Sequence, residues 1–319
     1  MTTLPDFRVE LSDEVGTILA QDFTISATTT KFVPHSSDGA ITFPNLDAKT
    51  QACKLIDTCV LYIDIRRSTE LSISHKPQTV AKLYSAFVRA MTKCARHFGG
   101  HVRGIIGDRV MVIFDCDDCF RKAVDCAILM NSTAQYVINR HFTRNDVQCG
   151  IGIDTGKMLV TKTGFRRRGI EQHNYKNLVW LGRPANVASK LTDIANKPSE
   201  GLQCDKVRVG YKAVFGNDLH WVNEWPSEFV KKVSHTFVGG MTHSNPNYRG
   251  HFMVKEYVET REYMSAILMT EPVYRGLKAT HPDVDYVQSE WFKKVTVEVP
   301  GYTDDVYGGN VTFNAFSQA

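Results

Sequence analysis

The sequence predicts an α+β fold, and three features support this: a strand that ends in an acid, a β-hairpin, and a helix on each side of the hairpin. In chain order these elements are a strand ending at residue 64, a helix at 75–98, hairpin strands at 102–106 and 110–113, a helix at 119–142 and a strand at 147–153. The order strand, helix, hairpin, helix, strand is that of a ferredoxin-like sandwich, in which helices cover one face of an antiparallel-rich sheet.

The two helices are predicted from apolar residues that recur every three or four positions. Such spacing places the residues on one face of a helix. In the first helix they are Leu83, Phe87, Met91 and Cys94, and Gly99-Gly100 ends the helix; in the second they are Ala123, Ala127, Met130 and Ala134. The strands are predicted from runs of β-branched residues.

Composition narrows the class of protein. The chain has 319 residues, of which 43% are hydrophobic and 23% charged, as in an ordinary globular protein. Its net charge of +4 is too small to argue for nucleic acid as a partner. No segment has the roughly 18 apolar residues of a membrane helix, and no signal peptide is visible. We therefore expect a cytoplasmic protein with no membrane or nucleic-acid partner.

The chain divides into three predicted segments. Residues 1–50 are poor in periodic apolar positions and are predicted to form an arm or lid with one short strand. Residues 51–260 hold the motifs described below. Residues 261–319 are a strand-rich extension that either finishes the sheet or adds a small cap. Within the central segment, the polar and basic stretch 161–177 is predicted to be a loop.

Two acids are the first candidates for chemistry. Asp64 ends a strand, and Asp108 lies at the turn of the hairpin, so both are expected at one place. Paired carboxylates bind the two divalent ions that bridge a polyphosphate and an attacking hydroxyl. Alternatively, Asp64 caps the next helix and Asp108 is an ordinary turn acid. The hydroxyls of Ser68 and Thr69, one turn past Asp64, favour the metal and phosphate interpretation.

A second pair lies on a later predicted helix. Asn186 and Lys190 are four residues apart, so their side chains lie on one face and can reach the same substrate. The alternative is that Asn186 caps the helix and Lys190 is exposed to solvent.

Together these motifs resemble the class III nucleotidyl cyclases. The resemblance rests on four stretches between residues 55 and 195: Ile-Asp64-Ile-x-x-Ser-Thr69, Gly107-Asp108-x-Val-Met-Val-x-Phe114, Gly150-Ile-Gly-Ile-Asp-Thr-Gly156 and Gly182-Arg-Pro-Ala-Asn186-Val-Ala-Ser-Lys190-Leu191. It implies that residues 51–260 are the catalytic domain of a head-to-tail homodimer.

The resemblance also implies roles for particular residues. Asp64, Ile65 and Asp108 occupy the positions that bind two Mn²⁺ or Mg²⁺ ions. Asn186 and Lys190 occupy those that act from the partner subunit on a nucleoside triphosphate. Lys190 departs from the family pattern, which usually has arginine there.

The positions that read a purine in this family are occupied here by Gly104 and Val179, neither of which has a polar side chain. In this respect, and in the long N-terminal arm, the chain resembles the family's pyrimidine cyclases of bacterial antiphage defence. That implies cyclic UMP, or else cyclic CMP, as product and a downstream effector that responds to it. Further candidates for substrate contacts are Tyr62, which equally suits core packing, and Arg66, Arg67, Ser68, Thr69, Arg103 and Arg183.

Two other functions stay open on the sequence. One is an adenylate cyclase that reads its base with other residues. The other is an inert cyclase-like module that serves only dimerisation, although such a module would normally have lost a metal-binding acid.

Overall fold

The computed structural model describes residues 3–143, 146–167, 170–197, 202–212, 219–236, 238–258 and 263–318. The chain forms two compact units. One comprises Met1–Lys197 together with Met264–Ala319, and the other is Pro198–Tyr263. This division differs from the predicted segments 1–50, 51–260 and 261–319, because the C-terminal residues join the first unit.

The first unit is built on a βαββαβ core. Its elements are β2 (Thr50–Ile65), α2 (Ser68–Ser74), α3 (Pro77–His97), β3 (Gly100–Ile106), β4 (Arg109–Phe114), α4 (Cys119–Ser132), the π-helix η1 (Thr133–Ile138), α5 (Asn139–His141) and β5 (Cys149–Arg167). The four strands lie in the order β5-β2-β4-β3, and each neighbouring pair is antiparallel. This is the strand order expected for a ferredoxin-like unit.

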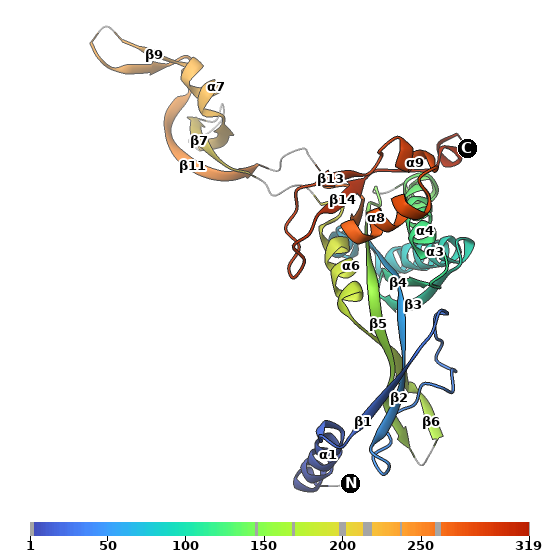
Figure 1. The fold of residues 1–319 in the computed structure, drawn as a ribbon. Helices are drawn as coiled ribbons and strands as arrows, with labels where there is room; N and C mark the ends of the chain where they lie inside the picture. Colours follow the sequence, from blue (N-terminus) through green and yellow to red (C-terminus); the bar gives the residue numbers. More distant parts are fainter. Residues whose placement is uncertain are drawn as a thin grey trace. The chain divides into compact units, whose positions relative to one another are not determined.

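The C-terminal residues extend the same sheet. The elements are β12 (Ile267–Thr270), α8 (Glu271–Thr280), α9 (Asp285–Gln288), β13 (Lys293–Val295), β14 (Val306–Gly309) and α10 (Asn314–Ser317). Strand β12 pairs in parallel with β5 and antiparallel with β14, which makes the sheet mixed. Of the two outcomes predicted for this segment, finishing the sheet is the one observed (Figure 1).

The sheet is covered on both faces. Alternate residues of β2, such as Leu61 and Ile63, pack with α3, α4 and α8 in one core cluster. The β2 residues that point to the opposite face, such as Val60, pack with α6 (Arg183–Ile194) and the N-terminal arm in a second cluster. The prediction of helices on one face is therefore wrong for α6, which lies on the opposite face from α3 and α4.

The arm contains α1 (Leu4–Leu19) and β1 (Thr24–Thr29). Strand β1 pairs in parallel with β2, as the predicted short strand, but the helix was not predicted. Its start is marked by Thr3, whose hydroxyl accepts a hydrogen bond from the Asp6 amide, with Pro5 in the first turn.

The segment predicted as a loop at 161–177 is instead mostly strand. It belongs to β5 and to β6 (Ile170–Leu181), which pair antiparallel. Where β2 and β5 continue beyond the helices, β1 and β6 flank them (Figure 1). Arg168, part of the basic run in this segment, lies outside the described residues.

The second unit is small. Its elements are β7 (Leu202–Lys212), β8 (Leu219–Glu224), α7 (Pro226–Lys231), β9 (Val233–His235), β10 (Met241–His243) and β11 (Tyr248–Val258). Strands β11, β7 and β8 form one sheet over a core of Val207, Val209 and Phe229. None of the described helices in either unit is long and apolar enough to cross a membrane.

Candidate active site

The two predicted acids lie together at one end of the central strands. Asp64 is the penultimate residue of β2, and Asp108 lies in the turn between β3 and β4. The Ile65 amide donates a hydrogen bond to Asp108 Oδ2 over 3.1 Å, which fixes the turn against the strand end. Burial, and next the charge of the adjacent Asp64 carboxylate, raise the pKa of Asp108 to about 6. A carboxyl pair of this kind favours a cation between its oxygens.

The structure does not fit the alternative roles of these acids, in which Asp64 caps the next helix and Asp108 is an ordinary turn acid. Helix α2, which follows Asp64, has Arg67 as its N-cap, with no side-chain capping bond. Asp108 is only 8% exposed, unlike an ordinary acid in a solvated turn.

Arg109 is a site residue that the sequence analysis missed. Its Nη2 and Nε lie 2.7 and 3.2 Å from Asp64 Oδ2. Its Nη1 donates to Ser189 Oγ over 2.9 Å, and its Nη2 also pairs with Asp193 on α6. The guanidinium therefore connects a predicted metal ligand to the helix that carries Asn186 and Lys190. Its place directly after Asp108 does not by itself predict these partners, because Asp64 and Asp193 lie 45 and 84 residues away in the sequence.

The donor set fits a hard divalent cation. Two carboxylates and a backbone carbonyl supply only oxygen, the ligand that Mg²⁺ prefers and Mn²⁺ accepts. The described residues contain no cluster of three or more His, Cys, Asp or Glu side chains. Asp64 and Asp108, with the Ile65 carbonyl, stay the ligands that the sequence motifs predict, and they would hold the ions together with substrate phosphates and water.

The glycines of the third motif set the position of α6. A Cβ at Gly152 would lie 2.2 Å from the Ala188 carbonyl oxygen, and one at Gly150 would lie 2.7 Å from the Thr192 carbonyl oxygen. Only glycine lets the helix backbone approach β5 so closely. Thr192 Oγ1 then donates to the Tyr62 carbonyl over 3.2 Å, which holds α6 against β2 beside Asp64.

Asn186 and Lys190 lie on α6 as predicted, but in the single chain they are not at the acids. Asn186 is exposed, and the N-cap of the helix is Gly182. Lys190 Nζ donates to the Pro300 carbonyl over 2.7 Å. Asn186 lies about 10 Å along the helix from Asp193, which shares Arg109 with Asp64.

The residues after Asp64 are placed as follows. The Arg66 guanidinium donates to the carbonyls of Thr192 and Asp193, so it caps the C-terminus of α6. The Arg66 amide donates to the Gln148 carbonyl and is unavailable to phosphate. Arg67 has a left-handed backbone with φ of 55°, and Ser68 and Thr69 begin α2.

The remaining predicted substrate residues lie apart from one another. Tyr62 is on the same face of β2 as Asp64, and burial raises the pKa of its hydroxyl. Arg183, at the start of α6, lies 3.7 Å from Asp154 Oδ1 and over the ring of Tyr302. Gly104 borders a cavity that Leu178 also lines.

Val179 does not face the second core cluster, because its neighbours Leu178 and Trp180 both do. The sequence pattern places Val179 beside Gly104 at the base. In the structure Leu178 is instead the β6 residue that lines the cavity with Gly104.

Residues 51–199 match the family model for the adenylate and guanylate cyclase catalytic domain. A uridylate cyclase from Xanthomonas perforans is 31% identical over 196 residues, which are 58% of this chain and 77% of that protein. The chain belongs to this family, the class III nucleotidyl cyclases, whose members use divalent metal ions.

Other relatives match a smaller share of their own length. A uridylate cyclase from Burkholderia cepacia is 32% identical over 145 residues, 44% of this chain and 60% of its own. A cytidylate cyclase from Staphylococcus aureus is 28% identical over 67% of this chain and 49% of its own. Among solved structures, the adenylyl cyclase CyaB from P. aeruginosa matches with a TM-score of 0.47 and 17% identity, over 80% of this chain and 93% of that one.

Proposed function

We propose that this chain is a nucleotidyl cyclase that converts a pyrimidine nucleoside triphosphate, UTP in preference to CTP, into the 3′,5′-cyclic nucleotide and diphosphate. The observation that carries the cyclase assignment is the meeting of Asp64 and Asp108 at the strand end, with Asp108 buried and its pKa raised. The resemblance adds a role as the source of a second messenger in antiphage defence, read by a downstream effector.

The reaction is an in-line transfer at the α-phosphorus. The ribose 3′-oxygen forms a bond to that phosphorus, the bond to the bridging oxygen breaks, and diphosphate leaves. When bound at Asp64, Ile65 and Asp108, the divalent ions lower the pKa of the attacking hydroxyl and stabilise the leaving phosphates.

The other residues position the substrate. Lys190 of one subunit neutralises the charge that develops on the α-phosphate, and Asn186 orients the ribose by hydrogen bonding. For this, Lys190 exchanges the Pro300 carbonyl for a phosphate oxygen, a stronger acceptor for an ammonium group.

The pyrimidine assignment rests on the purine-reading positions. Gly104 has no side chain, and the side chain of Val179 has no polar atom. Neither residue can therefore form a side-chain hydrogen bond to the edge of a purine base. A Cβ at Gly104 would meet only Met111, whose Cβ and Sδ would lie 3.4 and 3.8 Å away, both ordinary contacts. Packing around the Cβ position therefore does not impose glycine here. The uridylate and cytidylate cyclases among the relatives support the same substrate class.

The experiment is to incubate the purified protein with Mn²⁺ and each of ATP, GTP, CTP and UTP, and to identify the products by mass. We expect cyclic UMP to form fastest and Asp64→Ala and Asp108→Ala to abolish every product while keeping the wild-type circular dichroism spectrum. Preference for ATP by about tenfold or more would replace the pyrimidine assignment with an adenylate cyclase. No product with any triphosphate would favour an inert dimerisation module.

A further inference from the structure

A cavity of about 360 Å³ lies between the N-terminal arm and the catalytic sheet, at one of the two positions where the family reads its base. The residues lining it come from the arm, from β3 and from β6: His35, Ser36, Val102, Arg103, Gly104, Ile105 and Leu178. Its volume is in the range of small-molecule sites. The arm thus supplies one wall at the position that lacks a purine-reading side chain.

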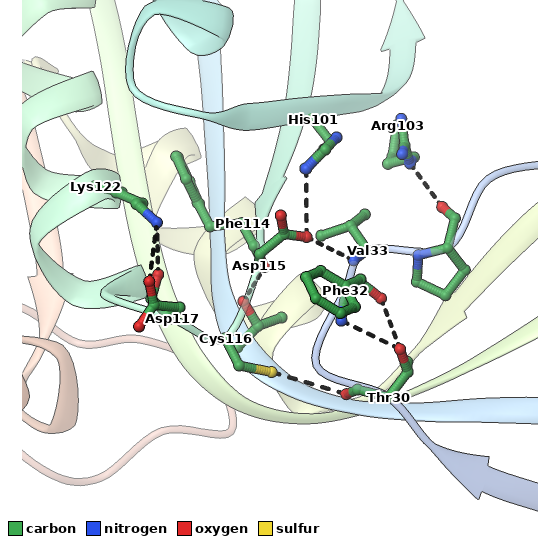
Figure 2. A network of polar contacts seen from close by, with 12 residues as sticks. Thr30, Phe32, Val33, His101, Arg103, Phe114, Asp115, Cys116, Asp117 and Lys122 are labelled. Atoms are coloured by element: carbon green, nitrogen blue, oxygen red, sulfur yellow. Dashed lines mark hydrogen bonds and ion pairs between the residues drawn. The ribbon is translucent and has the colours of Figure 1, made fainter.

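The arm is held by hydrogen bonds directly before this wall in the chain. Asp115 Oδ1 accepts a hydrogen bond of 2.7 Å from the Val33 amide and lies 3.3 Å from His101 Nε2. The Cys116 amide donates to the Lys31 carbonyl over 2.9 Å. Figure 2 shows these contacts meeting at the segment from Thr30 to Val33.

The next part of the arm is held by the cavity itself. Arg103 Nε donates to the Pro34 carbonyl over 2.9 Å, while Val33 and Pro34 are buried (Figure 2). His35 and Ser36 follow directly, so their backbone is held in place before a ligand arrives. A wall fixed in this way costs little ordering entropy on binding.

The chemistry of the lining suits a small heteroaromatic ring. Val102, Ile105 and Leu178 supply apolar surface for its faces. Arg103 has five N–H donors, of which the bonds to Pro34 and Val102 use two nitrogens, so donors remain for ring carbonyl oxygens. The Ser36 hydroxyl can donate and accept, and His35, whose Nδ1 is hydrogen-bonded to Ser37 Oγ over 2.6 Å, offers Nε2 as a donor or an acceptor to a ring edge with carbonyl and N–H groups.

We infer that His35 and Ser36 of the arm, together with Arg103, form the pocket that reads the pyrimidine base of the substrate. This rests on the proposed function and names the residues that determine its specificity. The arm then supplies, from outside the matched family domain, polar groups at the position where the domain itself has Gly104.

The test separates binding of the base from binding of the phosphates. Calorimetric titrations with UTP in its 3′-deoxy form, which lacks the attacking hydroxyl and cannot be cyclised, and with inorganic tripolyphosphate, both with Mn²⁺, are compared for the wild type and for Ser36→Ala, His35→Gln and Arg103→Lys. We expect each variant to weaken UTP about tenfold, as expected when one hydrogen bond to the base is lost, and to leave tripolyphosphate within about twofold. Ser26→Ala, on the exposed β1 of the same arm, is the matched control and should change neither constant.

Equal weakening of both ligands, or no weakening of UTP in any of the three variants, would overturn the inference. The proposed function is tested separately, by the rates at which the wild type forms products from ATP, GTP, CTP and UTP. If the wild type prefers ATP, the pyrimidine function fails. The arm pocket then stands as a base reader only if the variants change the ranking of the four bases.

Discussion

At the scale of single residues, the contact between Arg109 and Asp64 places a fixed cation where an ion is expected to bind. The side chains of both residues are about one-fifth exposed, at 23% and 18%, so their ion pair is partly shielded from solvent. Both guanidinium contacts go to Asp64 Oδ2, so a divalent ion that binds this oxygen has to displace at least one of them. Arg109 therefore competes with the metal, and its release loosens the tie to Ser189 and Asp193 on α6.

We expect Arg109→Ala to tighten Mn²⁺ binding about three- to tenfold, the effect of removing a competing ion pair worth about 1 kcal/mol. Arg109→Lys keeps the charge but loses the planar fork, and should give an intermediate affinity. Free Mn²⁺ is measured by electron paramagnetic resonance during titration. Arg96→Ala, which removes the same charge from the exposed surface of α3, is the control. Unchanged or weaker Mn²⁺ binding in Arg109→Ala would show that the pair does not compete with the metal.

The two acids could be predicted from sequence because a strand end and a hairpin turn are local features, each visible in a few residues. Arg109 could not, since its partners lie 45 and 84 residues away and become neighbours only when α6 packs on β5. Arg66 shows the same limit. As an arginine beside a phosphate motif it was expected to contact substrate, but its guanidinium satisfies the last carbonyls of α6.

At the scale of elements, α1 is the clearest difference between prediction and structure. Its apolar residues Phe7, Leu11, Val15 and Ile18 recur at intervals of four, four and three, yet all are exposed by more than a third. A helix with such a stripe is stable when another surface covers it. We propose that, in a two-fold dimer, the equivalent helix of the second copy covers this stripe.

Leu11→Ser should therefore weaken the dimer by about tenfold or more, the effect of losing one buried leucine side chain. Val9→Ser is the matched control, because Val9 is also exposed but lies on the opposite side of the helix. Sedimentation velocity over a range of concentrations gives both dissociation constants. If the two variants behave alike, α1 does not form the dimer interface.

The other differences between elements have physical causes. The β5 and β6 residues in the segment 161–177 are mostly polar, so their sequence lacks the apolar alternation that predicts a strand. The side of the sheet that α6 covers depends on the close approach at Gly150 and Gly152, which no periodicity reveals. In contrast, α3 and α4 bury regular stripes against the sheet, and their predicted positions agree with the structure.

At the scale of the whole molecule, the sequence motifs lie within one compact unit, while the predicted boundaries do not match the two units found. The C-terminal strands could not be assigned from sequence because they join β5 by pairing across more than 100 residues. The separate positions of Asp64 and Asn186 on a single chain bear on the quaternary structure, because the chemistry requires both at one substrate. We propose that a two-fold dimer with two equivalent sites brings them together.

Mixing variants tests this arrangement directly. Asp64→Ala and Asn186→Ala are each expected to be inactive. In a dimer that shares its sites, a mixed pair has one intact site, formed by Asp64 of one subunit and Asn186 of the other. Random exchange between equal amounts should restore about one quarter of wild-type activity, because half of the dimers are mixed and each has one of two sites.

The matched control for this experiment is a mixture of Asp64→Ala with Asp108→Ala. Both changes damage the same half of the site, so every site in every dimer lacks one acid, and no activity should return. Subunit exchange is checked by fluorescence energy transfer between labelled chains. If exchange occurs and the first mixture stays inactive, each site is built within one chain, and α6 must then move to bring Asn186 to the acids of its own subunit.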